Sequence, residues 1–257
     1  MALLSVQEVT MRFGGLVAND RISFDVAEGD LFAVIGPNGA GKTTLFNIIS
    51  GFFPPTEGGI AFDGRTITGL SQHAVANLGL VRTYQLVQLF KDLTVRENVA
   101  VGFHRVTRGG IPAALFRPAF ARRQEADIDR RSRELLDFVG LRAQADMLAD
   151  KLPYGQQRLL EVARALAAEP RLLLLDEPAA GLNTQETAAL AAIIERVNAR
   201  GVTVLLVEHD MSLVMKVARR IAVLDFGRKI AEGTPAEIQS HPDVIAAYLG
   251  GTETADA

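Results

Sequence analysis

The chain has 257 residues, of which 48% are hydrophobic and 22% charged, and its formal net charge is −3. This composition allows a sizeable folded core, makes disorder unexpected except at the ends, and provides no overall field that would attract nucleic acid. The absence of cysteine excludes disulfides and thiolate metal sites.

Neither a signal peptide nor a membrane-spanning helix is expected. The sequence begins MALLSVQEVTMRF, which lacks a basic segment followed by a long apolar run. The longest apolar run, in RLLLLDEP, is interrupted by Asp176, whereas a membrane helix needs roughly 20 apolar residues. We therefore expect any role at a membrane to depend on docking to something else.

The first third of the chain predicts antiparallel strands, then a buried strand and a helix. LLSVQEVTMRF and RISFDVAEGD show the partial two-residue alternation typical of antiparallel strands. LFAVIG (31–36) is the continuous apolar run of a buried parallel strand, and 42–50 follows as a helix. GIAFDGRTI predicts a hairpin that bends at Asp63-Gly64. Further helices are expected over 71–80 and 95–103.

The texture of the chain changes between about 104 and 134. HRVTRGGIPAALFRPAF holds prolines, paired glycines and arginines, and a charged amphipathic helix follows. Its arginines indicate a solvated face, with i,i+4 pairs such as Arg123 with Asp127 and Asp127 with Arg131. Contact with acidic lipids is the alternative.

Strands and helices then alternate, which favours a largely parallel sheet covered by helices. The expected helices span 156–168, 184–199 and 211–219, and the expected strands span 171–176, 202–207 and 221–225.

The segment GPNGAGKT, which starts at Gly36, fits the phosphate-binding P-loop pattern G-x-x-x-x-G-K-[ST]. Glycine lets backbone N–H groups approach phosphate oxygens without an intervening Cβ, and the helix that opens at 41–43 points its positive end at the same anion. Lys42 offers a mobile charge for the β- and γ-phosphates, and Thr43 a hydroxyl for Mg²⁺. The phosphate-contacting residues expected here are Gly36, Pro37, Asn38, Gly39, Ala40, Gly41, Lys42, Thr43 and Thr44.

Two further predicted strands end in ionisable groups. LLLLDEP (172–178) ends in Asp176, which would reach the Mg²⁺ shell, and Glu177, which could polarise a water for attack on the γ-phosphate. VTVLLVEHDM (202–211) brings His209 to the same sheet edge, where it could hydrogen-bond the γ-phosphate and the water. A purely structural histidine is the alternative.

Three weaker candidates lie elsewhere in the chain. Gln85, in VRTYQLVQLF, could contact Mg²⁺ or the attacking water. Phe13 could stack on adenine or merely cap the small N-terminal sheet. The helix that opens near Gly155 offers a second anion-binding end. One chain does not need two such ends for one γ-phosphate, but two facing chains could sandwich a shared nucleotide between them.

These segments, in this order and over residues 6 to about 230, resemble the ATP-binding subunits of ABC transporters. GPNGAGKTT resembles the Walker A motif, LLLLDEP the Walker B motif with its catalytic glutamate, and EHD the switch histidine. RTYQ resembles the Q-loop, AGLN (180–183) the D-loop, and MRFGG the aromatic loop that stacks adenine. LPYGQ stands where the family has its signature LSGGQ. The residues expected to contact the partner's nucleotide are Pro153, Tyr154, Gly155 and Gln156.

Two signature positions depart from the family pattern. Pro153 replaces the usual serine and removes a hydroxyl, while Tyr154 replaces a glycine and adds bulk. The backbone N–H groups around Gly155 and Gln156 remain, so a retuned contact is the interpretation rather than a dead site.

A narrower resemblance is to the branched-chain amino acid importer type. It is carried by the arginine-rich stretch after VRENVAVGFH, by LPYGQQR and DEPAAGLN, and by the tail GTPAEIQSHPDVIAAYLG. Importers for urea, amides or other small acids share much of it. Two other classes are disfavoured. ABC ATPases of DNA repair or translation usually show a second cassette, a long coiled coil or basic patches, and none is evident in this sequence. A P-loop kinase is disfavoured by the LPYGQQR helix before Walker B.

The resemblance implies an α/β fold with a RecA-like P-loop NTPase core, a small antiparallel β subdomain and a helical subdomain. The implied boundaries are 1–85 with 166–233 for the core and β subdomain, 86–165 for the helical signature subdomain with an insert at about 104–134, and 234–257 for a C-terminal tail.

The resemblance also implies ATP and Mg²⁺ as cofactors, with Glu177 and His209 catalytic and Thr43, Gln85 and Asp176 around the metal. The implied partners are a second ATP-binding subunit, identical or different, two integral membrane permeases and, indirectly, a periplasmic substrate-binding protein, but no nucleic acid. The expected location is the cytoplasmic face of the inner membrane, as a peripheral protein. The cargo is not encoded in such a subunit, which does not contact it.

Overall fold

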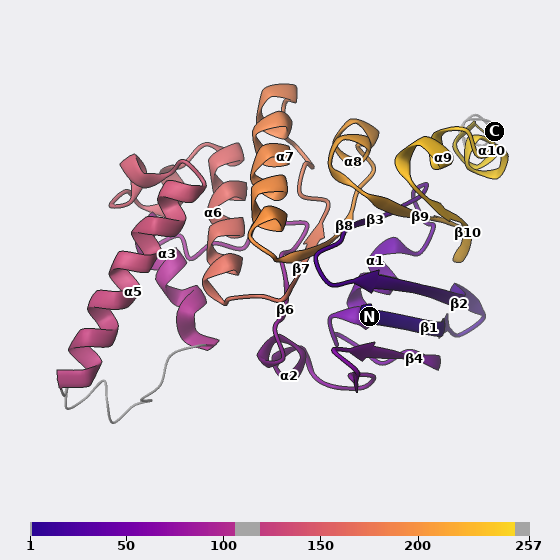
Figure 1. Cartoon of the computed structure of the whole chain (residues 1–257), viewed down its shortest axis with the longest axis horizontal. Helices are drawn as coiled ribbons and strands as arrows, with labels where there is room; N and C mark the ends of the chain where they lie inside the picture. The colour runs from indigo at the N-terminus through magenta and orange to yellow at the C-terminus, as the bar shows by residue number, and fades with distance from the viewer. Residues whose placement is uncertain (1, 106–118, 250–257) are drawn as a thin grey trace. The chain divides into compact units, whose positions relative to one another are not determined.

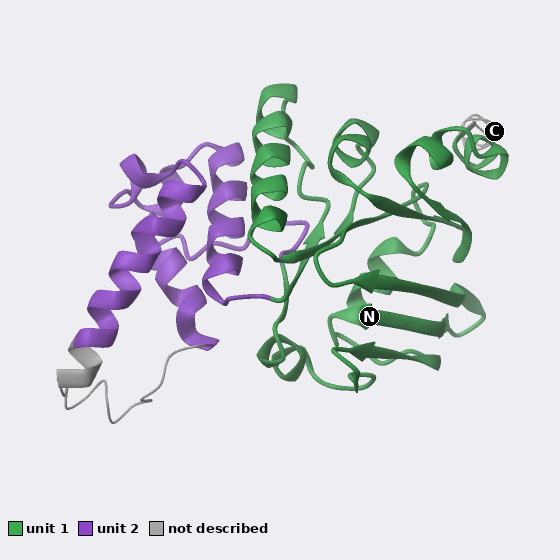
Figure 2. Cartoon of the chain, viewed as in Figure 1, with its two compact units in different colours: residues 1–82, 171–257 green, residues 83–170 purple. Residues whose placement is uncertain are grey.

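The computed structural model describes residues 2–105 and 119–249. The chain divides into two compact units, residues 1–82 with 171–257, and residues 83–170 (Figure 2). Of the insert expected at about 104–134, residues 106–118 lie outside the described residues, as do residues 250–257 of the expected tail.

The first unit contains a four-stranded antiparallel sheet in the order β2-β1-β4-β5. The strands predicted near the N-terminus are confirmed, and so is the hairpin at Asp63-Gly64. Both residues of that bend have positive φ, 52° and 71°, as the tight two-residue turn requires. The four strands are β1 (Ala2–Phe13), β2 (Leu16–Ala27), β4 (Glu57–Phe62) and β5 (Arg65–Thr66).

A six-stranded sheet in the order β10-β9-β3-β8-β7-β6 forms the centre of the same unit. Its strands from β9 to β6 pair in parallel, and β10 is antiparallel to β9. Continuous apolar runs make β3, β7 and β8 buried at every position, which is typical of strands covered on both faces. The strands are β3 (Leu31–Ile35), β6 (Leu80–Arg82), β7 (Leu172–Asp176), β8 (Thr203–Val207), β9 (Arg220–Asp225) and β10 (Arg228–Gly233).

Two of these strands, β6 and β10, were not expected from the sequence. The helix predicted over 71–80 is shorter, α2 (Gln72–Asn77), and the chain turns at Gly79, whose φ is 102°, before it enters β6. A three-residue strand is too short to show periodicity, so pairing with β7 is what defines it.

Helices cover both faces of the six-stranded sheet. In Figure 1, α7 (Thr184–Ala199) and α8 (Met211–Val217) lie on one side, and α1 (Lys42–Ile49) lies on the other with the four-stranded sheet. Apolar side chains of α1, the small sheet and the central strands form one buried cluster, which includes Phe32 and Phe46. The C-terminal segment adds α9 (Pro235–Gln239) and α10 (Pro242–Leu249).

The second unit is helical. It contains α3 (Val95–Gly102), α5 (Ala119–Phe138) and α6 (Tyr154–Ala167), joined by 3₁₀ turns at Phe103–Arg105, Arg142–Gln144 and Ala149–Lys151. The helices predicted over 95–103 and 156–168 are confirmed, with α6 starting two residues earlier than predicted.

The arginine pairs predicted within α5 are wrong in detail. Asp127 pairs with Arg130, three residues further along the helix. Arg130 also pairs with Glu134. The guanidinium carbon of Arg131 instead lies 4.5 Å from the centre of the Phe103 ring, and Arg131 pairs with Glu169. An aromatic face and a distant carboxylate therefore replace the local pairing that helix periodicity suggests.

No helix within residues 2–105 and 119–249 is both long and apolar enough to cross a membrane.

Asn198 tests how the end of α7 is fixed to the sheet. Its buried Nδ2 donates to the carbonyl oxygens of Gly29 (2.9 Å), Asp30 (3.2 Å) and Val202 (3.0 Å). Asn198→Asp replaces this donor with a carboxylate that faces carbonyl oxygens, so we expect the free energy of unfolding in urea to fall by about 2–4 kcal/mol. The exposed Asn77→Asp is the control, and an equal effect of both changes would contradict this account.

Candidate functional site

The segment between β3 and α1 is a tight loop, and two of its positions can be occupied only by glycine. Gly36 and Gly41 have φ of 152° and 93°. A Cβ on Gly36 would lie 2.1 Å from the carbonyl oxygen of Leu224, and one on Gly41 would lie 2.4 Å from that of Ala18. These glycines are therefore required by the chain's own backbone, in addition to any approach of phosphate.

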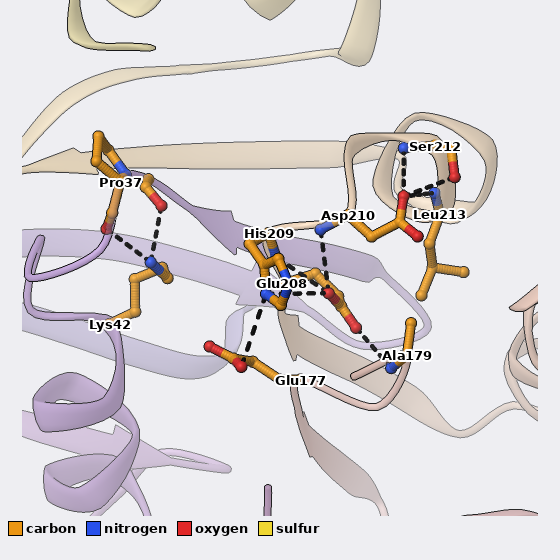
Figure 3. Close-up of polar contacts among 10 residues, drawn as sticks. Pro37, Lys42, Glu177, Ala179, Glu208, His209, Asp210, Ser212 and Leu213 are labelled. Atoms are coloured by element: carbon orange, nitrogen blue, oxygen red, sulfur yellow. Dashed lines mark hydrogen bonds and ion pairs between the residues drawn. The ribbon is translucent and has the colours of Figure 1, made fainter. Parts of the chain in front are cut away.

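Lys42 is folded back into this loop. Its side chain is almost fully buried, and Nζ donates to the carbonyl oxygens of Gly36 (2.7 Å) and Pro37 (2.8 Å) (Figure 3). Burial lowers the pKa of Lys42, and the negative charge of Glu177 opposes that shift. The ammonium group is thus held by carbonyl oxygens whose place phosphate oxygens could take.

The start of α1 fits an anion. The helix begins after Gly41 without a side-chain cap, and its first turn contains no acidic residue. Thr43 is exposed in that turn. The N-terminal N–H groups and the positive end of the helix are therefore available for a negatively charged ligand, with the Lys42 charge beside them.

Glu177 and His209 meet at the carboxyl edge of the sheet. Glu177 follows β7, and its Oε2 lies 3.6 Å from Nδ1 of His209, which follows β8 (Figure 3). The Glu177 backbone is left-handed, with φ of 44°, and its N–H donates to the carbonyl oxygen of Val207 at 2.9 Å. Such a conformation is strained for a residue with a Cβ, and it turns this carboxylate toward the histidine.

A buried carboxylate holds the two loops together. Glu208 is completely buried; its Oε1 accepts from the N–H of Ala179 (2.7 Å) and its Oε2 from those of His209 (3.0 Å) and Asp210 (3.2 Å) (Figure 3). Burial raises the pKa of Glu208, and the three backbone donors act against that shift. Sequence reasoning did not select Glu208, although a charged residue directly after an apolar strand was the available signal.

Asp176, the last residue of β7, is also buried. Its Oδ2 forms an ion pair of 2.7 Å with Nη2 of Arg82, the last residue of β6. The expected metal ligands in this unit, the Asp176 carboxylate and the Thr43 hydroxyl, are the hard oxygen donors that Mg²⁺ prefers. No cluster of three or more His, Cys, Asp or Glu residues suited to a metal occurs in the described part of the chain. Mg²⁺ does not need one, because it completes its shell with phosphate oxygens and water.

Phe13 lies at the end of β1 with half of its side-chain surface exposed. Its ring meets the ring of Phe53 edge to face, with centroids 5.8 Å apart, and Phe53 makes a similar contact with Phe52 at 5.7 Å. The edge contact fixes the orientation of Phe13, and the exposed part of the ring remains able to stack on a planar ligand.

The remaining expected site residues belong to the second unit. Pro153 occupies the N-cap position of α6, where no side chain accepts a hydrogen bond from the first N–H groups of the helix. Pro153 and Tyr154 are exposed, Gln156 is half-buried and Gly155 is buried. The start of α6 therefore presents backbone N–H groups that no side chain caps.

Gln85 is an exposed loop residue of this second unit. Its carbonyl oxygen and that of Tyr84 both accept from the buried guanidinium of Arg158, on α6, the bond to Tyr84 being 2.9 Å long. Arg158 also pairs with Glu161 at 3.3 Å. The role of Arg158 was not expected, because the two carbonyl groups it binds are more than seventy residues away in sequence.

The chain is similar to known proteins over most of its length. Residues 19–180 match the family model "ABC transporter", and residues 228–254 match "Branched-chain amino acid ATP-binding cassette transporter". The chain is 47% identical over 249 residues to the high-affinity branched-chain amino acid transport ATP-binding protein BraF of Pseudomonas aeruginosa, covering 96% of this chain and 98% of that protein.

Solved structures give the same picture. An ATP-binding cassette of an ABC transporter in its ADP conformation superposes with a TM-score of 0.84 at 31% identity, covering 97% of this chain and 99% of the other. A cassette solved as a dimer in a post-hydrolysis state, bound to ADP and phosphate, has a TM-score of 0.76 at 25% identity and covers 90% of this chain and 98% of its own.

Glu208→Gln tests the carboxylate that joins the two loops. The substituted amide can accept through one atom only and would turn an NH₂ group toward a backbone N–H, so we expect the free energy of unfolding to fall by about 1–3 kcal/mol. Urea denaturation measures the change. Glu195→Gln, on the exposed side of α7, is the matched control and is expected to shift stability by less than about 0.5 kcal/mol.

Proposed function

Because this chain belongs to the ABC transporter family of ATP-binding proteins, we propose that it powers the import of branched-chain amino acids. The chain is an ATP-binding and ATP-hydrolysing subunit of such a transporter. The cargo is the proposed part. The observation that carries it is the match of residues 228–254 to a model specific to branched-chain amino acid cassettes, because the nucleotide motifs are common to the whole family.

The proposed ATP site is the loop 36–44. The backbone N–H groups at the start of α1 would hold the phosphates, and Lys42 would exchange its two carbonyl contacts for phosphate oxygens. Phe13, half exposed at the end of β1, would stack on adenine.

The proposed magnesium site uses Thr43 and Asp176 of the first unit, with Gln85 as a further ligand. Magnesium bound with ATP neutralises part of the phosphate charge. The chain contributes a hydroxyl at the start of α1 and a buried carboxylate whose orientation is fixed by its ion pair.

For hydrolysis, we assign the polarisation of the attacking water to Glu177 and its orientation to His209. The 3.6 Å separation of their side chains supports this assignment, because a water or a phosphate oxygen beside one of them is then within reach of the other. Glu208 accepts a hydrogen bond from the His209 backbone N–H and so helps to hold the loop after β8.

The proposed partner of the site is a second ATP-binding subunit, identical or different. Residues 153–156 of one subunit would contact the γ-phosphate bound by the other, chiefly through the uncapped N–H groups of α6. The dimeric relative supports such an assembly. ATP would then favour the closed dimer, because it makes contacts there that the open form lacks, and hydrolysis would release them.

Two permease subunits would embed the complex in the membrane, and a periplasmic binding protein would deliver the cargo. The chain would then be peripheral, at the cytoplasmic face of the inner membrane, and no nucleic acid would take part. A function in DNA repair or translation remains the alternative of another class; copurification with an integral membrane protein separates the two. The kinase interpretation is set aside, because the residues that match the ABC transporter family model, 19–180, include the P-loop, the LPYGQ segment and LLLLDEP.

The cargo can be tested in the organism that encodes the chain. Deletion of its gene is expected to reduce the uptake of radiolabelled leucine, isoleucine and valine at least tenfold and to leave urea and acetamide uptake unchanged. A wild-type copy should restore uptake. If urea or acetamide uptake falls while leucine uptake persists, the chain serves one of the related importers instead.

Glu177→Gln is expected to bind ATP normally and to lower its hydrolysis by roughly 10²–10⁴-fold, because the amide cannot act as a base while its size is unchanged. Dimers that accumulate with ATP should be detectable by size-exclusion chromatography. Glu195→Gln is the control with unchanged turnover. Normal hydrolysis by the Glu177 variant would refute its assignment.

A further inference from the structure

We propose that Arg82 is a positioning residue that fixes the Asp176 carboxylate relative to the phosphate-binding helix α1. This inference rests on the proposed magnesium site and extends it. Arg82 ends β6, an edge strand of the central sheet. It is the first residue of the RTYQ segment, in which the expected role falls on Gln85.

The guanidinium of Arg82 joins two elements through separate nitrogens. Nη2 forms the 2.7 Å ion pair with Oδ2 of Asp176. Nη1 donates to Oδ1 of Asn47 (2.8 Å) and to Oγ of Ser50 (2.8 Å), both in the last turns or C-cap of α1. The guanidinium carbon also lies 5.8 Å from the centre of the Phe46 ring. A planar group with donors in fixed directions can make these contacts together, whereas the single ammonium of lysine cannot.

This connection ties the two proposed metal ligands of the first unit, Thr43 and Asp176, to one helix. Thr43 lies in the first turn of α1, and Asn47 and Ser50 lie further along it. Arg82 therefore ties Asp176 to the same rigid element that carries Thr43. The ion pair engages Oδ2 of Asp176, so the carboxylate keeps a second oxygen, Oδ1, for the proposed magnesium site.

Burial makes the contact sensitive to the loss of either partner. The side chains of Arg82 and Asp176 are only 6% and 4% exposed. A buried ion pair is a weak source of net stability, since an apolar pair of the same size often serves as well, but removing one partner leaves an uncompensated charge. A pair at the end of two adjacent strands, at the edge where the ligand binds, is therefore better explained by orientation than by stability.

The experiment measures how strongly magnesium strengthens nucleotide binding. Affinity for a non-hydrolysable ATP analogue is determined by calorimetry with Mg²⁺ and with EDTA, and the ratio of the two dissociation constants reports the metal's contribution independently of the folded fraction. For Arg82→Met we expect this ratio to fall at least tenfold while the affinity in EDTA changes less than about threefold. Arg82→Lys should fall between this variant and the wild type.

Arg171→Met is the matched control. Arg171 lies directly before β7, at the opposite end of the strand that carries Asp176, and pairs with Glu28 and Asp63. Its loss removes the same charge and breaks two ion pairs, yet the ratio should stay at the wild-type value.

A double variant removes the contacts of Arg82 with α1, here called the anchor, and leaves the ion pair with Asp176 in place. Asn47→Ala with Ser50→Ala should lower the ratio about two- to fivefold, which keeps the proposal testable if Arg82→Met does not fold. Equal loss of affinity with and without Mg²⁺ in the Arg82 and anchor variants would overturn the role of Arg82. If the wild-type protein binds the ATP analogue equally well with Mg²⁺ and with EDTA, the magnesium site of the proposed function is itself wrong.

Discussion

The structure depends on one constraint, the complete burial of the parallel strands β3, β7 and β8. A strand covered on both faces cannot carry ionisable side chains along its length, so those groups appear only where the strands end. Because the strands are parallel, their carboxyl ends lie at one edge. Lys42, Asp176, Glu177 and His209 all follow from that geometry, although they come from three separate segments.

Charges at such an edge need compensation, and the chain supplies it in two ways. Glu208 accepts hydrogen bonds from three backbone N–H groups, which connect the loop after β7 to the loop after β8. Asp176 is paired with Arg82, whose other contacts reach α1. In both cases the compensating group also determines where a neighbouring loop or helix lies, so stability and site geometry have the same physical origin.

The second unit repeats this principle in a helical setting. Arg158, buried on α6, donates to the carbonyl oxygens of Tyr84 and Gln85 and pairs with Glu161. Burial raises the pKa of Glu161, and Arg158 opposes that shift. The chain passes from the first unit to the second directly after Arg82. Arg82 is held within the first unit by Asp176, and the residues that follow, Tyr84 and Gln85, are held within the second unit by Arg158.

The sequence by itself determined the parallel core and predicted the residues proposed to carry its chemistry. Apolar runs defined β3, β7 and β8, and the glycine spacing from Gly36 to Gly41 defined the P-loop, because these signals are local. Only the tertiary structure decided how those groups are held. Arg82 and Asp176 are 94 positions apart, and β6 and β10 exist through pairing with neighbours. Periodicity reports a residue's own segment, whereas a buried charge is matched by whatever the fold brings beside it.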